Sequence, residues 1–239
     1  MVPLPKMNHD QPLVSCICLT HNSIDLLQRS IRCFRDQTYR NKELIVSFSA
    51  DNTTAAGLLD RLRDPAIRPL IYSPGQKMTL GEKRNAAIGD ARGHYICNWD
   101  DDDWHHMKRI ETQVKYLLGT KYKASILSKL ILYDGVSGDS YISATRWGWE
   151  QTLVCEKSTF DDPDWQYQHL DRGEDSPLIY KLKQNDLLVS IPSPHLYIYV
   201  YHSQNVFHRE HWEVNLLPWA EKMTPDRAAV VRGELGVGV

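Results

Sequence analysis

Four short apolar segments, each followed by a helical pattern, constrain the fold of this chain most strongly. The segments span residues 13–19, 42–49, 68–75 and 94–99. Continuous apolar segments of this length are typical of strands that are buried on both faces, as in a parallel sheet. Strand and helix patterns alternate over about 118 residues. The sequence therefore predicts an α/β fold, with a mainly parallel sheet flanked by helices.

Capping signals mark the helices between these segments. Asn22 or Ser23 is a suitable N-cap for a first helix, whose apolar residues recur at i, i+4 and i+7. Thr79 and Glu82 have the spacing of a capping box, which predicts a helix from about residue 80. A further helix is predicted with four residues on one apolar face: Met107, Ile110, Val114 and Leu117.

The second half of the chain has a different character. Short apolar segments separated by turn residues predict a mixture of strands and turns after about residue 118. Ser176 followed by Pro177 predicts the start of one more helix, because proline is favoured at the first helical position. The segment after about Pro218 has weak apolar spacing, and we assign no structure to it.

Composition excludes several classes of protein. The chain has 239 residues, 42% hydrophobic and 24% charged, which is typical of a globular domain. A net charge of −2 argues against a nucleic-acid-binding protein. No transmembrane helix is predicted, and residues 1–12 lack the apolar region of a secretory signal. The five cysteines lie in apolar segments, as reduced buried thiols do. We expect a cytoplasmic location, with peripheral attachment to a membrane as the alternative.

Four consecutive aspartates, Asp100–Asp103, follow the fourth apolar segment. Two unit charges about 4 Å apart repel by about 4 kcal/mol at an effective dielectric constant of about 20, so this run needs an explanation. Ligands of open α/β sheets bind at the carboxyl ends of strands, and strand alternation would place Asp100 and Asp102 on one side. Carboxylates there can share Mg²⁺ with substrate phosphates. A solvated acidic turn is the alternative, but the position after a strand favours a metal and nucleotide diphosphate site.

Several short motifs, in order, resemble the family-2 glycosyltransferases of the GT-A fold. In the first half they are Thr20-His21-Asn22, Gln37-Thr38-Tyr39, Gly81 with Arg84-Asn85, Ala91–Ile96 and Asp100–Asp103. Two looser matches follow in the second half, Glu174-Asp175 within "RGEDSPL" and His202 within "YVYHSQN". The resemblance spans about residues 12–205 and is specific in the first half.

The resemblance implies a role for each matched residue. Asp175, with Glu174 beside it, corresponds to the catalytic base of inverting members, and glycosyl transfer requires a base to take the hydroxyl proton. Capping of the following helix is the alternative role for Asp175. The implied ligands of Mn²⁺ or Mg²⁺ are Asp102, Asp103 and His202. The implied contacts to the nucleotide sugar are Thr20, Asn22, Asp51, Arg84, Asp100 and Asp101. For Arg84, pairing with the acidic run is the alternative.

One departure concerns the donor base. The second strand of the family usually ends in an Asp-Asp-Gly-Ser-like turn whose aspartate reads the base, whereas this chain has "SFSADNT" with Ser49 and Asp51 as the nearest substitutes. The resemblance therefore implies a UDP- or GDP-type sugar donor without deciding between them. The resemblance leaves the acceptor open among a glycan, a lipid-linked glycan and a protein.

The resemblance implies a single GT-A domain over residues 1–239. We expect a nucleotide-sugar-binding half at about 12–118, an acceptor-side half at about 119–217 and a C-terminal tail at 218–239. The function implied is metal-dependent inverting glycosyl transfer, of the hexosyltransferase class. A non-catalytic nucleotide-sugar-binding protein is one alternative, and the carboxylates at 174–175 argue against it. A nucleotidyltransferase is the other, and it would usually open with a glycine-rich basic loop where this chain has "LTHNS".

Overall fold

The computed structural model describes residues 11–21, 23–202, 205 and 208–237, and the structural statements below concern these residues. Their main feature is a seven-stranded sheet in the order β10-β6-β9-β4-β1-β2-β3. Its strands are β1 (Val14–Leu19), β2 (Lys42–Ser49), β3 (Ile67–Tyr72), β4 (Tyr95–Asn98), β6 (Ala124–Leu127), β9 (Val154–Glu156) and β10 (Leu188–Ile191). β1 pairs in parallel with β2 and β4, and only β9 runs antiparallel to its neighbours. The predicted α/β fold is confirmed.

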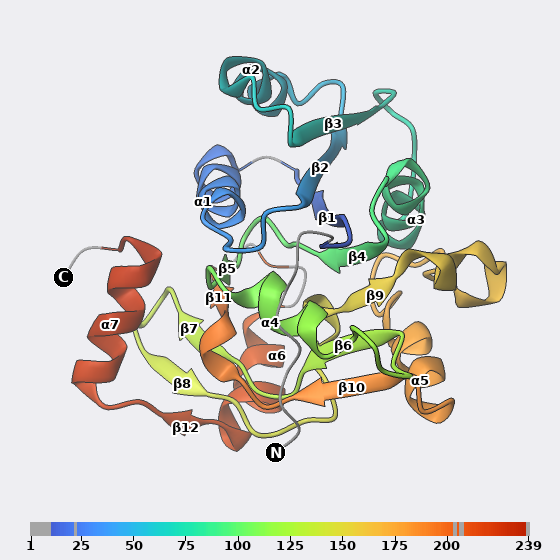
Figure 1. Ribbon diagram of the computed structural model, residues 1–239. Helices are drawn as coiled ribbons and strands as arrows, with labels where there is room; N and C mark the ends of the chain where they lie inside the picture. Colours follow the sequence, from blue (N-terminus) through green and yellow to red (C-terminus); the bar gives the residue numbers. More distant parts are fainter. Residues whose placement is uncertain (1–10, 22, 203–204, 206–207, 238–239) are drawn as a thin grey trace.

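Helices cover both faces of this sheet (Figure 1). They are α1 (Ile24–Arg35), α2 (Thr53–Leu62), α3 (Leu80–Asp90), α4 (Arg109–Lys115) and α5 (Ser176–Gln184). Two more helices, α6 (Arg209–His211) and α7 (Pro225–Leu235), lie in the C-terminal part of the chain. The alternation of side chains along β1 explains the two layers. Cys16 and Cys18 pack with α1, α2 and α4 on one face, whereas Ile17 packs with α3 and α5 on the other.

A second, mixed sheet of five strands has the order β12-β8-β7-β11-β5 and lies toward the lower left in Figure 1. Its strands are β5 (Trp104–His105), β7 (Ile131–Asp134), β8 (Ser140–Ile142), β11 (Tyr197–Tyr201) and β12 (Glu221–Lys222). β5 follows the acidic run directly and pairs with β11 in antiparallel orientation. The acidic run therefore connects the two sheets.

Local signals in the sequence located several element ends. α1 begins after Ser23, and the capping box between Thr79 and Glu82 at the start of α3 is present with both of its hydrogen bonds. The prediction for Met107 was wrong, because α4 begins at Arg109 and the Met107 side chain is 46% exposed. Asn22, the other candidate cap, lies outside the described residues.

The C-terminal segment, to which the sequence analysis assigned no structure, forms β12 and α7. One side of α7 is buried against the main core through Val231 and Leu235. No helix within the described part of the chain combines the length and apolar character needed to cross a membrane.

Candidate active site

The carboxyl ends of β1, β2 and β4 lie at the same edge of the sheet, because these strands are parallel. Thr20 follows β1, Asp51 lies two residues after β2, and the acidic run follows β4. Residues from three distant parts of the sequence therefore gather at one edge, where open α/β sheets bind ligands. We call residues 100–103 the acidic loop.

The aspartates of the acidic loop point toward different partners. The Asp100 carboxylate faces Arg84, with Oδ1 3.5 Å from Nη2. The Asp102 carboxylate lies 3.1 Å from the Nε2 atom of His202. Burial and then the charge of Asp102 raise the pKa of Asp101 to about 7, although a hydrogen bond with Thr20 opposes this shift. The repulsion expected from the sequence is therefore present, and neighbouring groups partly offset it.

Asp103 is turned into the protein and is only 1% exposed. Its carboxylate accepts hydrogen bonds from the Tyr197 hydroxyl at 2.5 Å and from the Val200 backbone N–H at 2.8 Å. Burial, followed by the charges of Asp102 and Asp100, raises the pKa of Asp103 well above its usual range. Because both oxygens already accept protein donors, Asp103 anchors the acidic loop to β11, and we leave it out of the metal ligands proposed below.

Asp102 and His202 form the solvent-facing pair of the acidic loop. Their side chains are 26% and 21% exposed, and Asn205 donates to the same Asp102 oxygen at 3.3 Å. Within the described residues, no group of three His, Cys, Asp or Glu side chains is arranged to hold a metal ion. A carboxylate beside an imidazole nevertheless fits a hard or borderline divalent cation that takes its other ligands from phosphate and water.

A buried cation that the sequence analysis missed supports the backbone of the acidic loop. Arg109 is 0% exposed, and its guanidinium donates to the Asn98 carbonyl at 2.8 Å and to Nδ1 of His105 at 2.6 Å. His105 Nε2 in turn lies 3.0 Å from the Asp100 carbonyl. Burial and the charge of Arg109 hold the pKa of His105 well below its usual range. The neutral imidazole therefore donates through Nε2 to the loop.

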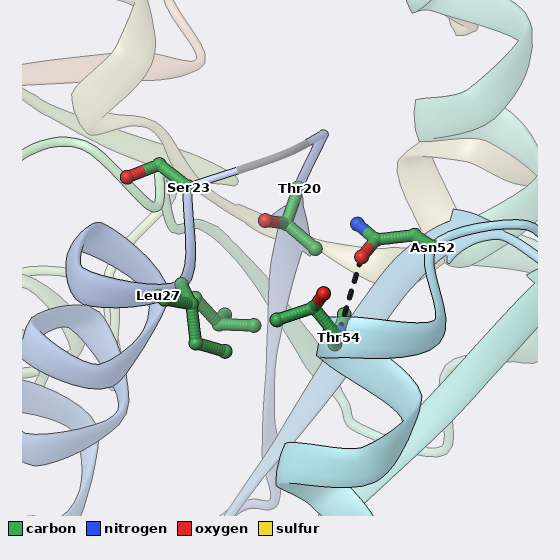
Figure 2. A pocket seen from close by; sticks show the side chains of 7 residues that line it. Thr20, Ser23, Leu27, Asn52 and Thr54 are labelled. Carbon is green, nitrogen blue, oxygen red and sulfur yellow. Dashed lines mark hydrogen bonds between the residues drawn. The ribbon is translucent and has the colours of Figure 1, made fainter.

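The donor-side residues surround the ends of β1 and β2. Figure 2 shows Thr20 between Ser23 and Asn52, which line one small pocket together with Leu27 and Thr54. The Asn52 side chain caps α2 by accepting from Ala55 N–H, and it also donates to the His21 carbonyl. Asn52 thus ties the loop after β1 to α2. The predicted donor contacts Thr20 and Asp51 lie at this edge, and Asn22 lies outside the described residues.

Arg84 links the acidic loop to the segment that carries Asp175. It is 6% exposed, and its Nε donates to Glu174 Oε1 at 3.0 Å while Nη2 faces Asp100. The structure shows the pairing with the acidic loop that was given as the alternative for Arg84, and the implied contact of Arg84 with the nucleotide sugar stays a prediction. Glu174 is 3% exposed and is engaged by Arg84, so Asp175 is the more accessible carboxylate of the two.

Asp175 immediately precedes α5 but makes no side-chain capping hydrogen bond. Burial, and then the nearby charge of Glu174, raise its pKa to about 7. A carboxylate with this pKa is ionised in half of the molecules near neutral pH, which suits a general base better than an ordinary aspartate does. The absent hydrogen bond removes the main support for the alternative role in capping.

The start of α3 contacts residues 167–175, which we call the acceptor loop. Gly81 N–H donates to the Leu170 carbonyl at 3.1 Å. The Asn85 side chain donates to the Tyr167 carbonyl at 2.8 Å and accepts from its N–H at 3.0 Å. The Gly81, Arg84 and Asn85 motif therefore contacts the acceptor loop at three points.

Gly81→Ala tests the close contact between α3 and the acceptor loop. A Cβ at position 81 would lie 1.8 Å from the Gln168 carbonyl oxygen, so the loop backbone must move. We expect a loss of about 1–3 kcal/mol in the free energy of unfolding, measured by denaturant titration. Gly89→Ala on the same helix is the matched control, because nothing lies within 4 Å of its Cβ position, and it should stabilise by about 0.4–1 kcal/mol. Equal effects of the two substitutions would contradict the close approach.

Four aromatic residues of the second half of the chain divide into two groups. Trp149 and Tyr167 are buried, at 5% and 1% exposure, and they belong to the core. Trp147 is 39% exposed and Trp165 is partly exposed. The flat face of an exposed indole ring can stack on a sugar, so Trp147 and Trp165 are the candidates for acceptor contacts.

Comparison with known proteins identifies the family. The profile described as Glycosyl transferase family 2 matches residues 15–151, which is more than half of the chain. The chain belongs to glycosyl transferase family 2. The resemblance predicted from the motifs is therefore confirmed. The match includes the acidic loop and the Arg84 motif, whereas Asp175 and His202 lie beyond it.

Relatives and solved structures agree with this family-2 assignment. The uncharacterized glycosyltransferase MJ1057 of Methanocaldococcus jannaschii is 31% identical over 110 residues, 45% of this chain and 38% of that protein. S. aureus TarS in complex with UDP-GlcNAc superposes with a TM-score of 0.66 at 14% identity, over 80% of this chain and 59% of that one. Mannosyltransferase PcManGT of Pyrobaculum calidifontis, in complex with GDP-Man and Mn²⁺, gives 0.62 at 14% identity, over 84% and 59%. These similarities show the GT-A fold, and this chain spans less than two thirds of each protein.

Proposed function

We propose that this family-2 protein is a metal-dependent, inverting hexosyltransferase that moves a sugar from a nucleotide-diphospho-sugar to an acceptor hydroxyl. The observation that carries the proposal is Asp175, a partly exposed carboxylate with a pKa near 7 and no capping bond. It is linked through Glu174 and Arg84 to the acidic loop at the ligand-binding edge of the sheet. Two proteins of similar fold are in complex with nucleotide sugars: TarS with UDP-GlcNAc, and PcManGT with GDP-Man and Mn²⁺. This supports a donor of the same class.

In the proposed reaction, Asp175 takes the proton of the acceptor hydroxyl. The acceptor oxygen forms a bond to the anomeric carbon from one side, while the bond between that carbon and the diphosphate oxygen breaks on the other. The configuration at the anomeric carbon is therefore inverted, and the nucleoside diphosphate departs with the bonding electron pair. The protein's base has to be ionised, so we expect the transfer rate to rise with pH through about 7.

The proposed cation ligands are Asp102 and His202. Mn²⁺ or Mg²⁺ bound there would stabilise the negative charge of the leaving diphosphate. The residues proposed to contact the nucleotide sugar are Thr20, Asn22, Asp51, Asp100 and Asp101. Arg84 pairs with the Asp100 carboxylate. In this proposal Asp102 binds the cation, Asp100 and Asp101 contact the donor, and Asp103 anchors the loop to β11.

A donor panel tests the proposal. We expect UDP-glucose, UDP-GlcNAc or GDP-mannose to raise the melting temperature with Mn²⁺ present and much less with EDTA. The bound donor should then be hydrolysed slowly, with water as the acceptor, to a sugar of inverted anomeric configuration visible by NMR. Tight donor binding without any hydrolysis or transfer would favour a non-catalytic nucleotide-sugar-binding protein. Retained configuration would exclude the inverting mechanism.

A further inference from the structure

Arg84 is a buried cation between two loops that come from different halves of the chain. Its Nε lies 3.0 Å from Glu174 in the acceptor loop, and its Nη2 lies 3.5 Å from Asp100 in the acidic loop. The third nitrogen, Nη1, is buried and has no hydrogen-bond partner among the described residues. The other two nitrogens therefore join the two loops, and the inference below rests on these two contacts.

The acceptor loop is fixed at its start by groups that surround Arg84. The Tyr167 ring centre lies 5.7 Å from the Arg84 guanidinium carbon, and the Tyr167 hydroxyl donates to Asn98 Oδ1 at 3.0 Å. Asn98 is the last residue of β4, directly before the acidic loop. One end of the acceptor loop is thus held by Tyr167, and Glu174 holds the other end through Arg84. Asp175 follows Glu174, and its side chain makes no capping hydrogen bond to α5.

We propose that Arg84 is a positioning residue, which holds Glu174 and Asp100 in a fixed relation so that Asp175 stands beside the donor end of the sheet. This inference rests on the proposed function, because it assigns Asp175 the role of base. Arginine is suited to the task, since its planar fork engages two carboxylates at once, whereas the single ammonium of lysine does not. Arg84 itself would touch neither the diphosphate nor the acceptor.

The same arrangement sets the charge environment of Asp175. The charged groups that face it are Glu174 in the acceptor loop, Arg84 on α3 and Glu150 before β9. Burial raises the pKa of Asp175 most, the two glutamates raise it further, and Arg84 lowers it. Geometry and charge can therefore be changed separately at this pair, because Arg84→Lys keeps the charge and Glu174→Gln keeps an acceptor for the Arg84 Nε.

The experiment compares these two variants with the parent protein. The titration of the Asp175 carboxyl is followed by carbon-13 NMR, with Asp175→Asn to assign the signal. Glu174→Gln should lower the pKa of Asp175 by about one unit or more, because a neighbouring negative charge is removed. Arg84→Lys should leave this pKa near its parent value. It should nevertheless lower donor hydrolysis by about 10²-fold while the donor Kd changes much less, since a displacement of about 1 Å of the base costs that much in rate.

Hydrogen exchange supplies a readout that does not depend on activity. Arg84→Lys should speed the exchange of backbone amides at residues 168–176 and leave those of β1 and β2 unchanged. Lys83→Gln, one position earlier on α3, is the matched control and should change neither exchange nor hydrolysis. If Arg84→Lys fails to fold, the double variant Arg84→Met with Glu174→Gln is used in its place for the exchange and rate measurements. This double variant removes both charges of the pair.

Three results would overturn the inference. The first is an Asp175 titration that Glu174→Gln leaves unchanged, and the second is Arg84→Lys with parent-like loop exchange and hydrolysis. The third is a loss of donor affinity equal to the loss of rate, because that pattern belongs to a general structural role. Failure of the proposed function is a separate outcome. In that case Asp175→Asn keeps the parent rate, while the NMR titration and the exchange data still test Arg84.

Discussion

Asp175→Asn should lower the transfer rate by about 10²–10⁴-fold, which is the usual contribution of a general base. The amide keeps the size of the side chain but cannot take up the acceptor proton. Donor affinity should change little, because the base contacts the acceptor and not the diphosphate. The measurement is the rate of UDP or GDP release from the donor selected in the panel, together with calorimetric binding of that donor.

The stability of the same variant distinguishes the base from a helix cap. A capping aspartate contributes about 0.5–2 kcal/mol, so its loss would lower the melting temperature. Asp175 makes no capping hydrogen bond, and its pKa is raised in the folded state to about 7. The folded protein then holds this proton more tightly than the unfolded chain, so stability falls as pH rises from about 4 through 7. Asp175→Asn removes that loss, and its melting temperature above pH 7 should equal or exceed that of the parent.

The matched control for this prediction is Asp171→Asn. Asp171 lies in the same acceptor loop, and its Oδ1 accepts from the Leu80 N–H at 3.1 Å, a bond that an asparagine oxygen can keep. Its rate should therefore be close to that of the parent. If Asp175→Asn melts at a lower temperature and transfers sugar at the parent rate, Asp175 is a structural residue and the base lies elsewhere.

Features determined by neighbouring residues could be read from the sequence. The range of β2 (Lys42–Ser49) coincides with the predicted segment, and the capping box of α3 is formed by the predicted pair. Both depend on contacts within a few residues. The start of α4 depends instead on where the chain leaves β5, so Met107 was assigned to a helix that begins only at Arg109.

The direction of each acidic side chain could not be predicted in this way. β4 ends at Asn98, so the strict alternation of a strand no longer governs the four aspartates that follow Trp99. Asp103 turns inward because Tyr197 and Val200 on β11, more than 90 residues away, supply its two donors. Such contacts depend on how the second sheet packs, and the sequence near the acidic loop carries no sign of them.

Arg84 and Arg109 show the same limit for cations. On a helix pattern each is one arginine among several charged residues, yet both are almost fully buried. Arg109 becomes a support of the acidic loop through His105, and Arg84 becomes a link to Glu174. The resemblance marked Arg84 through its motif, whereas no motif marked Arg109. Long-range contacts therefore decide the roles of both residues.

Asp102→Asn should abolish the metal-dependent part of donor binding while the protein stays folded. Asp102 is the carboxylate that lies beside His202 with part of its surface exposed, and the amide would replace a charged ligand by a neutral one. With the nucleoside diphosphate at about 100 times its Kd and Mn²⁺ present, binding should stabilise the parent by about 2.7 kcal/mol. For a domain of this size, that raises the melting temperature by about 5–10 °C, and the variant should show little of this increase.

The protein without ligands provides the second half of this test. Asp102 adds a negative charge beside three other carboxylates, so its removal relieves repulsion within the acidic loop. The melting temperature of unliganded Asp102→Asn should therefore match or exceed that of the parent. Asp60→Asn, an exposed position on α2, is the control and should keep the full response to Mn²⁺ and nucleotide. An Asp102→Asn protein that binds the nucleotide with parent affinity only when Mn²⁺ is added would remove Asp102 from the cation site and shift the assignment to its neighbours in the loop.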